Sequence, residues 1–63
     1  MSARAVRLTV QELAGRWRVS PRTLERWRAE ASGPPWLRLK GRVLYRLEDV
    51  LAYERAHLRD AAD

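Results

Sequence analysis

The sequence of 63 residues lacks cysteine and contains one histidine, His57. The lack of cysteine excludes disulfide bonds and thiolate metal sites, and one histidine cannot form a metal site by itself. No apolar run approaches the ~20 residues that a membrane-spanning helix needs, and the N-terminus has no apolar stretch typical of a signal peptide. We therefore expect a cytoplasmic protein that binds no metal, no other cofactor and no membrane.

The short length also argues against catalysis. A chain of this size buries only roughly 60% of its unfolded surface on folding, which leaves no room for a deep catalytic pocket. Ser20 is better placed to cap a helix than to act as a nucleophile, since His57 belongs to a different predicted helix. Glu48, Asp49 and Glu54 suit solvated positions and a helix dipole better than a catalytic pair. We expect one domain that is not an enzyme.

Positive charge is concentrated in the middle of the chain. The formal net charge is +5, from 13 basic and 8 acidic residues. Residues 16–47 carry nine basic and two acidic side chains, whereas residues 48–63 carry two basic and five acidic ones. This asymmetry favours a surface that faces a polyanion such as nucleic acid, although a solvated arginine-rich surface would give the same composition.

Local signals predict a first helix over residues 10–17. Thr9 and Glu12 have the spacing of a capping box, in which each side chain accepts a hydrogen bond from the backbone N–H of the other residue. An apolar stripe at helical spacing follows, consisting of Val10, Leu13, Ala14 and Trp17. Because the helix is short, packing must hold it in place.

A second helix is predicted over residues 21–31. Ser20 is a favoured N-cap residue, and Pro21 suits the first helical position, where a missing N–H costs nothing. Gly33 ends the helix, and the two prolines after it prevent continuation. The apolar face consists of Leu24, Trp27 and Ala31. The connection, with Val19 as its apolar residue, is so short that the two helices form a helix-turn-helix unit.

A β-hairpin is predicted after the two prolines. Residues 36–39 and 43–46 contain strand-forming residues, and Lys40-Gly41-Arg42 lies between them as a basic tip. Alternation predicts an inward set that consists of Leu37, Leu39, Val43 and Tyr45. The outward set consists of Arg38, Leu44 and Arg46.

The last helix is predicted over residues 48–58, with acidic residues in its first turn that suit the helix dipole. Its apolar face consists of Leu47, Val50, Leu51 and Leu58. The fold class is therefore mainly α with a β-hairpin (α+β), with a flexible arm at residues 1–7, the domain at 8–58 and a frayed C-terminus at 59–63. The predicted structural core consists of Leu13, Trp17, Leu24, Trp27, Leu39, Tyr45, Val50 and Leu51.

The second helix carries the side chains best suited to read DNA. With its apolar face buried, the opposite face presents Arg22, Thr23 and Arg26. Arginine binds the edge of guanine by a bidentate fork, and residues near the start of a recognition helix reach the bases. We assign these three residues to base edges or adjacent phosphates, and Arg28 to the DNA backbone or solvent.

Further DNA contacts are expected from the turn and the hairpin. A basic two-stranded arm can follow the phosphate backbone or enter a minor groove, where arginine is favoured. The expected contacts outside the second helix are Arg18 and Ser20 in the turn and Arg38, Lys40 and Arg42 in the hairpin.

These assignments have alternatives. The arginines of the second helix could instead pair with Glu25 or Glu30 on a solvated face. The hairpin tip could be an ordinary polar turn. Trp17 and Trp27 are expected in the core, whereas Trp36 either covers the core edge or contacts a partner.

Four segments, in this order and spacing, resemble the small winged helix-turn-helix proteins of the excisionase and AlpA type, which are relatives of the MerR DNA-binding domain. The segments are residues 8–14, 19–24, 33–36 and 42–50. The resemblance implies a winged helix-turn-helix fold whose second helix, with Arg22, Thr23 and Arg26, enters the major groove. It implies that the hairpin is a wing, with Lys40 and Arg42 on the DNA backbone or in the minor groove.

The resemblance also implies a function. Small members of this type resemble recombination directionality factors, which bend DNA for an integrase, or transcription regulators of phages and mobile elements. We accordingly expect sequence-specific binding of double-stranded DNA on the nucleoid, with cooperative self-association through Trp36, Leu44 and the acidic last helix. The chain is too short for the dimerisation helix and effector domain of MerR regulators, so no small-molecule effector is expected. The alternative is an adaptor that contacts an integrase, polymerase or terminase, with DNA binding secondary.

Overall fold

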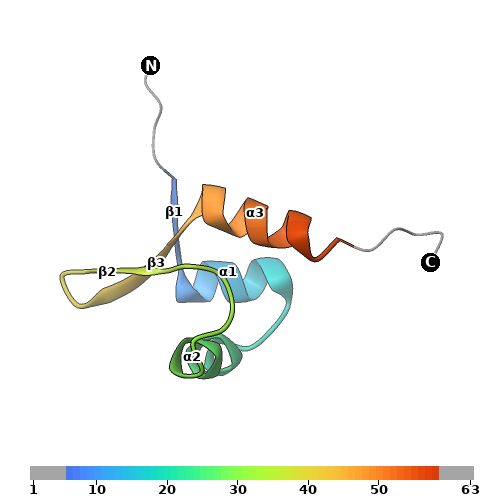
Figure 1. Ribbon diagram of the computed structural model, residues 1–63. Coiled ribbons are helices and arrows are strands. Elements are labelled where there is room, and N and C mark those ends of the chain that lie inside the picture. Colours follow the sequence, from blue (N-terminus) through green and yellow to red (C-terminus); the bar gives the residue numbers. More distant parts are fainter. Residues whose placement is uncertain (1–5, 59–63) are drawn as a thin grey trace, which may run out of the picture.

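The computed structural model describes residues 6–58. In chain order, its elements are β1 (Arg7–Thr9), α1 (Val10–Trp17), α2 (Pro21–Ala29), β2 (Leu37–Leu39), β3 (Arg42–Arg46) and α3 (Leu47–Ala56), as Figure 1 shows. The strands form one antiparallel sheet in the order β1-β3-β2. The predicted class, mainly α with a β-hairpin, is confirmed, and the arrangement fits a winged helix-turn-helix.

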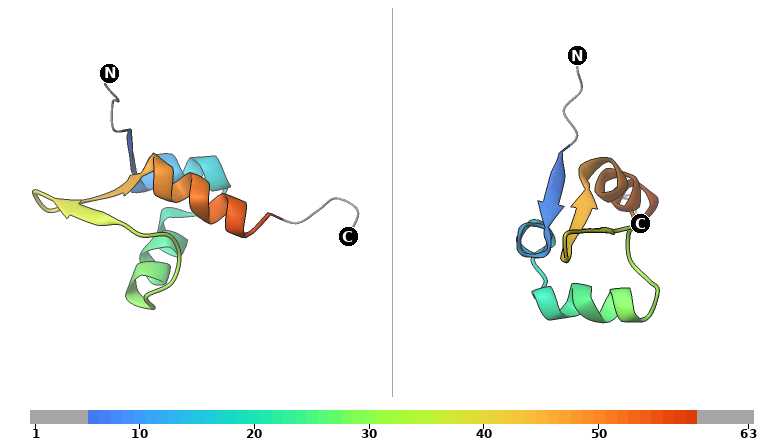
Figure 2. Two further views of the ribbon diagram at one scale, coloured as in Figure 1. Left: turned by 45° about the horizontal axis from the view of Figure 1, so that its top comes forward. Right: turned by 90° about the vertical axis from the view of Figure 1, so that its left-hand side faces the viewer.

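The arrangement of α1 and α3 leaves α2 and the hairpin accessible to solvent. α3 lies beside α1 (Figure 1), whereas α2 crosses α1 steeply on the side away from α3 (Figure 2). The hairpin formed by β2 and β3 extends beyond the helices in both figures. α3 therefore covers neither α2 nor the hairpin.

One strand was not predicted. Of the predicted arm, residues 1–5 lie outside the described part of the chain, as does the predicted frayed segment 59–63. Arg7, however, begins β1, and Leu8 pairs with Tyr45 of β3. A strand of three residues leaves no periodic pattern in the sequence, and its partner β3 is separated from it by both α1 and α2.

The predicted start of α1 and the turn after it are confirmed. The Glu12 N–H donates to Thr9 Oγ1 at 3.1 Å, and the Thr9 N–H donates to Glu12 Oε1 at 2.8 Å. At the other end, Arg18 adopts a left-handed conformation with φ 59°, and the Val19 N–H returns to the Ala14 carbonyl at 3.0 Å. Val19 thereby packs against the core, as expected of the apolar residue in the turn.

α2 begins as predicted but ends earlier. The Ser20 side chain accepts from the Thr23 N–H at 3.2 Å, and Pro21 occupies the first turn. The helix ends at Ala29, because Ala31 has a left-handed φ of 57° and the Ser32 N–H closes onto the Trp27 carbonyl. The prediction that Ala31 lies on the apolar face of α2 is therefore wrong, since Ala31 is exposed.

The hairpin has a tighter turn than predicted, and this changes which side chains share a face. Lys40 and Gly41, both with positive φ, form the two-residue turn, so that Arg42 belongs to β3. Leu37 then pairs with Leu44, and Leu39 pairs with Arg42. Directly paired residues point to the same side of a sheet. The prediction that Leu37 and Leu39 point inward is therefore wrong.

The face toward α1 and α2 carries the other set of hairpin side chains. Arg38 pairs with Val43, and Val43 and Tyr45 pack in the core. Arg38 therefore shares the inward face, and its predicted outward orientation is wrong. Leu44 lies on the opposite, outer face, as predicted.

The core is smaller than predicted. Its buried members are Leu13, Ala14, Leu24, Tyr45 and Val50. Trp17 and Trp27 are half-buried against them, with ring centroids 6.3 Å apart. The assignment of Leu39 and Leu51 to the core is wrong, because these side chains are 47% and 40% exposed. The register of the hairpin places Leu39 on the outer face of the sheet, where it pairs with Arg42.

Only a narrow face of α3 packs against the core, which explains why Leu51 is exposed. Val50 is fully buried, and Tyr53 stacks on Trp17 with ring centroids 5.4 Å apart. Leu51 is one helical position past Val50 and therefore points to the side. Leu58 was predicted on the apolar face, but it lies beyond the end of α3 and is 76% exposed.

A carboxylate joins α1 to α3 at this edge of the core. Glu54 accepts hydrogen bonds from Arg16 Nε at 2.6 Å and from Trp17 Nε1 at 2.6 Å. These bonds, that of Arg16 first, lower the pKa of Glu54 from 4.5 to about 2. Glu54 was predicted to occupy a solvated position, and the structure instead gives it a specific structural role.

We expect the Glu54 contact to make stability depend on acid pH. Since the folded-state pKa lies below the unfolded one, the carboxylate stabilises the fold above about pH 4.5 and loses this effect as the pH falls toward 2. Glu54→Gln should lower the urea midpoint of unfolding at neutral pH. As the pH is lowered, the midpoint of this variant should decrease less than that of the unmodified protein. Glu30→Gln is the control, because Glu30 forms no salt bridge within residues 6–58. An unchanged pH dependence in Glu54→Gln would contradict this role.

The two glycines Gly33 and Gly15 give opposite predictions for substitution by alanine. Gly33 has φ +84°, and an added Cβ would lie 3.1 Å from Trp27 Cε3. Gly33→Ala should destabilise the domain by about 1–2 kcal/mol. Gly15 lies in α1 with open space around it, and Gly15→Ala should stabilise by about 0.5–1 kcal/mol. Thermal unfolding followed by circular dichroism measures the stability of both variants. Equal changes in stability for Gly33→Ala and Gly15→Ala would contradict the structural role given to Gly33.

Candidate nucleic-acid interface

The exposed face of α2 is built by the burial of the opposite face. Leu24 is fully buried and Trp27 is half-buried, so the helix can rotate little about its axis. Arg22 and Arg26, one helical turn apart, are both exposed. Within residues 6–58 neither of them forms a salt bridge, so the alternative pairing with Glu25 or Glu30 does not occur in the structure.

Thr23 differs from its two predicted partners. It is half-buried, and its Oγ1 lies 3.0 Å from the Ser20 hydroxyl. Thr23 therefore lies at the flank of the exposed face, beside the helix start. Glu25, predicted only as an alternative partner of the arginines, is exposed and lies three residues after Arg22, next to it on the helix.

The turn before α2 presents the two residues predicted there. Arg18 is exposed at the C-cap of α1, where its left-handed backbone redirects the chain. Ser20 is exposed, and its hydroxyl is engaged in capping α2. Both residues therefore lie beside the first turn of α2.

The three cations predicted for the hairpin divide between its two faces. Lys40 lies in the turn itself, at the end of the arm that extends beyond the helices (Figure 1). Arg38 lies on the face toward α2, and Arg42 lies on the outer face with Leu44. All three side chains are exposed.

Arg28 is not a free surface side chain but connects α2 to the hairpin. It is half-buried, and its Nη1 donates a hydrogen bond to the Tyr45 hydroxyl at 2.9 Å. Its guanidinium carbon also lies 5.7 Å from the centre of the Trp36 ring. No sequence pattern predicts this contact, because Arg28 and Tyr45 belong to different elements.

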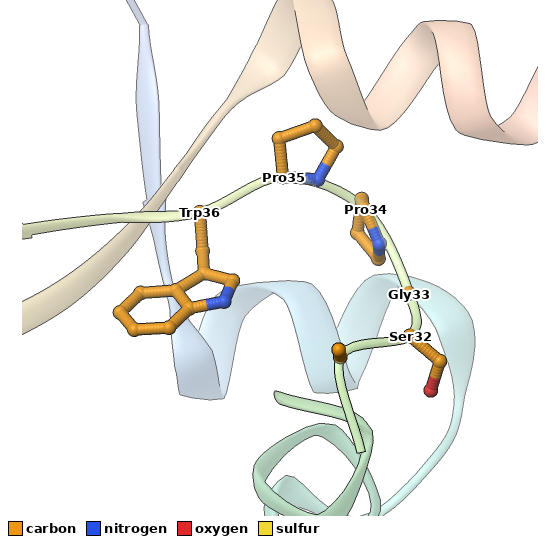
Figure 3. A pocket seen from close by; sticks show the side chains of 6 residues that line it. Ser32, Gly33, Pro34, Pro35 and Trp36 are labelled. Carbon is orange, nitrogen blue, oxygen red and sulfur yellow. The ribbon is translucent and has the colours of Figure 1, made fainter. Parts of the chain in front are cut away.

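The segment that joins α2 to β2 orients Trp36. Ala31 to Trp36 line an open hollow of about 340 Å³ (Figure 3). In Figure 3 the Trp36 and Pro35 rings lie on opposite sides of this segment. Trp36 is 39% exposed, so it is not part of the core.

Ion pairs divide the basic residues into two groups. Arg16 is paired with Glu54, and Arg46 with Asp49 and Glu48. The hydrogen bond to Asp49 raises the pKa of Arg46. Within the described chain, no salt bridge is formed by the cations of the turn, α2 and the hairpin, namely Arg18, Arg22, Arg26, Arg28, Arg38, Lys40 and Arg42, nor by Arg7 and Arg55.

The described residues offer little for other kinds of site. From residue 6 to residue 58, no group of three or more histidine or acidic side chains is arranged to hold a metal ion. Over the same range, no helix has the length and apolar character to cross a membrane. What the arrangement does offer is a set of uncompensated guanidinium groups on one helix, its turn and a projecting hairpin.

The comparisons with known proteins agree with this arrangement. The chain matches the helix-turn-helix domain family over residues 7–57, which include every described helix and strand through Ala56. A search of the curated proteins and of the solved structures gave no significant match.

Proposed function

The chain belongs to the helix-turn-helix domain family, a family of DNA-binding domains, and on this premise we propose that it binds specific double-stranded DNA sites as an excisionase-type factor or a small transcription regulator. The observation that carries the proposal is the distribution of unpaired cations. Of the nine lysine and arginine side chains that form no salt bridge within residues 6–58, seven lie on α2, its turn and the hairpin, whereas Arg16 and Arg46 are neutralised by carboxylates. A surface of uncompensated guanidinium groups favours a polyanion.

In the proposed complex, α2 enters the major groove. Arg22 and Arg26 are exposed on the side opposite the buried Leu24, and they read base edges or bind the phosphates beside them. Thr23 and Ser20, at the start of the helix, are placed for a phosphate, as is Arg18 in the turn. Glu25, three residues after Arg22 at the edge of this face, can accept a hydrogen bond from cytosine N4.

The hairpin acts as a wing on the DNA backbone or in the adjacent minor groove. Lys40 at its tip and Arg38 and Arg42 on its two faces supply the positive charge. A projecting two-stranded arm suits this role because a narrow minor groove attracts inserted cations. Contacts of this kind position the protein without specifying sequence.

The biological role in the proposal follows the excisionase type. One domain of this size covers a modest length of DNA, so tight binding calls for copies on adjacent sites. Such an array bends DNA for an integrase, and the same binding at a promoter regulates transcription. The protein would then act on the chromosome in the cytoplasm. The exposed Trp36, the outer-face Leu44 and α3 are candidates for contacts between neighbours.

The roles of Arg22 and Arg26 predict a defined loss of binding. We expect Arg22→Ala with Arg26→Ala to reduce the slope of log K against log salt by roughly 2, at about 0.9 per phosphate contact, or to relax base preference where an arginine reads a base. A site selected from random DNA is the probe, in fluorescence anisotropy. Arg7→Ala with Arg55→Ala removes the same charge and is the control, because neither residue forms a salt bridge in the described region.

Two outcomes would contradict the assignment. Binding that ignores salt would point to the adaptor alternative, in which an integrase, polymerase or terminase is the main partner. Equal losses in the two double variants would show that net charge alone, and not the face of α2, determines binding.

The array model predicts cooperative binding to adjacent sites. In a gel-shift titration, a duplex with two neighbouring sites should pass from free to doubly bound with little singly bound complex. The reason is that contacts between neighbours add to the DNA contacts of each copy. Independent filling of the two sites, with the same affinity as a single site, would refute self-association while leaving DNA binding intact.

A further inference from the structure

Trp36 contacts two arginines that come from different elements. The guanidinium carbons of Arg28, from α2, and Arg38, from β2, each lie 5.7 Å from the centre of the Trp36 ring. Both distances are within the range in which the face of an indole attracts a guanidinium group. Because Trp36 and Arg38 are two residues apart on an extended chain, their side chains leave the chain on the same side.

The two arginines lie around one ring, and within residues 6–58 neither has an anionic partner. Twice the ring distance, about 11 Å, is the largest separation their guanidinium carbons can have. Neither arginine forms a salt bridge with any of residues 6–58. The ring of Trp36 and the Tyr45 hydroxyl hold Arg28, but both partners are neutral. The positive charge of the pair is therefore held in place without being neutralised.

The pair connects the proposed DNA contacts of α2 with those of the hairpin. Arg28 lies in the second half of α2, past the residues assigned to bases, and Arg38 lies in the middle of β2 on its α2 side. A DNA strand carries a phosphate for about every 3.4 Å of helix axis. Two guanidinium groups within about 11 Å of one another can therefore bind the same phosphate or nearby phosphates of one strand.

We propose that Trp36 is a positioning residue that holds Arg28 and Arg38 together as one phosphate-binding site between the recognition helix and the wing. This inference rests on the proposed function, since its ligand is the DNA backbone. Trp36 fixes the direction of both side chains before DNA arrives, so that less side-chain freedom is lost on binding. The Tyr45 hydroxyl supports the site by accepting a hydrogen bond from the same guanidinium group of Arg28.

The test compares ring and non-ring substitutions of Trp36 in the full chain. Binding to a fluorescein-labelled duplex of random sequence is measured over a series of salt concentrations, because a phosphate site acts on any sequence. Trp36→Leu removes the aromatic face and should weaken binding about fivefold, whereas Trp36→Phe keeps a face and should retain most of the affinity. Arg55→Ala, on α3 and away from the site, is the control for general effects of charge.

A double-mutant cycle separates positioning from direct contact. In the background Arg28→Ala with Arg38→Ala, Trp36→Leu should cause almost no further loss, because there is nothing left to position. A fivefold loss in that background as well would show that Trp36 contacts DNA itself or supports the fold, and would overturn the proposal. So would equal affinity of Trp36→Leu and the unmodified protein.

Tyr45→Phe keeps the inference testable if Trp36→Leu unfolds. It retains the buried ring and removes only the hydroxyl that accepts from Arg28. We expect about a twofold loss of affinity in the unmodified background and none when Arg28 is alanine. Equal losses in both backgrounds would contradict the site. The unmodified protein could bind the duplex with the expected salt dependence while Trp36→Leu and Tyr45→Phe cause no loss of affinity. In that case the inference fails and the proposed function stands.

Discussion

The burial of Leu24 is the constraint on which the interface depends. This side chain is fully buried between the helices and the sheet, and it fixes the rotation of α2 about its axis. Once that rotation is fixed, Arg22 and Arg26 face outward, because helical geometry places them on the opposite side. A small domain with five fully or nearly fully buried hydrophobic side chains has few ways to hold a helix, so the same packing determines both stability and the direction of the charges.

The hairpin is placed by a second constraint, its two-residue turn. Because Lys40 and Gly41 both have positive φ, Arg38 pairs with Val43 on the side of the sheet that faces α2. A turn one residue longer would shift the pairing and move Arg38 to the other face. Together with the buried Tyr45, this register brings the α2 side chain Arg28 into contact with the wing. The Arg28 side chain therefore joins α2 directly to the hairpin.

The sequence predicts the parts of the fold that depend on near neighbours. The capping box of Thr9 and Glu12 and the cap at Ser20 act within one helical turn, and both appear in the structure. Contacts between distant residues, such as Glu54 with Trp17, leave no pattern in the sequence. Leu39 was misplaced for a related reason, since its face depends on the exact turn rather than on alternation alone.

For the candidate interface, the sequence indicates the elements and most of the cations but not their surroundings. Arg22 and Arg26 follow from the helix period, whereas the contact of Arg28 with Tyr45 and the two arginines around Trp36 depend on tertiary packing. Thr23, which was predicted to contact DNA bases, lies half-buried at the flank of the exposed face, with its hydroxyl 3.0 Å from that of Ser20. The sequence therefore identifies the charge, and the fold decides where each charge points.

The most direct test of the account is a nuclear magnetic resonance titration of the labelled protein with a duplex that contains its selected site. The account predicts that the largest shifts fall on α2, its turn and the hairpin, with the Nε signals of Arg22, Arg26 and Arg38 among them. The paired Nε of Arg16, which is bound to Glu54, should shift little. Shifts concentrated on α3 and on Trp17, with α2 unchanged, would contradict the claim that this face binds DNA.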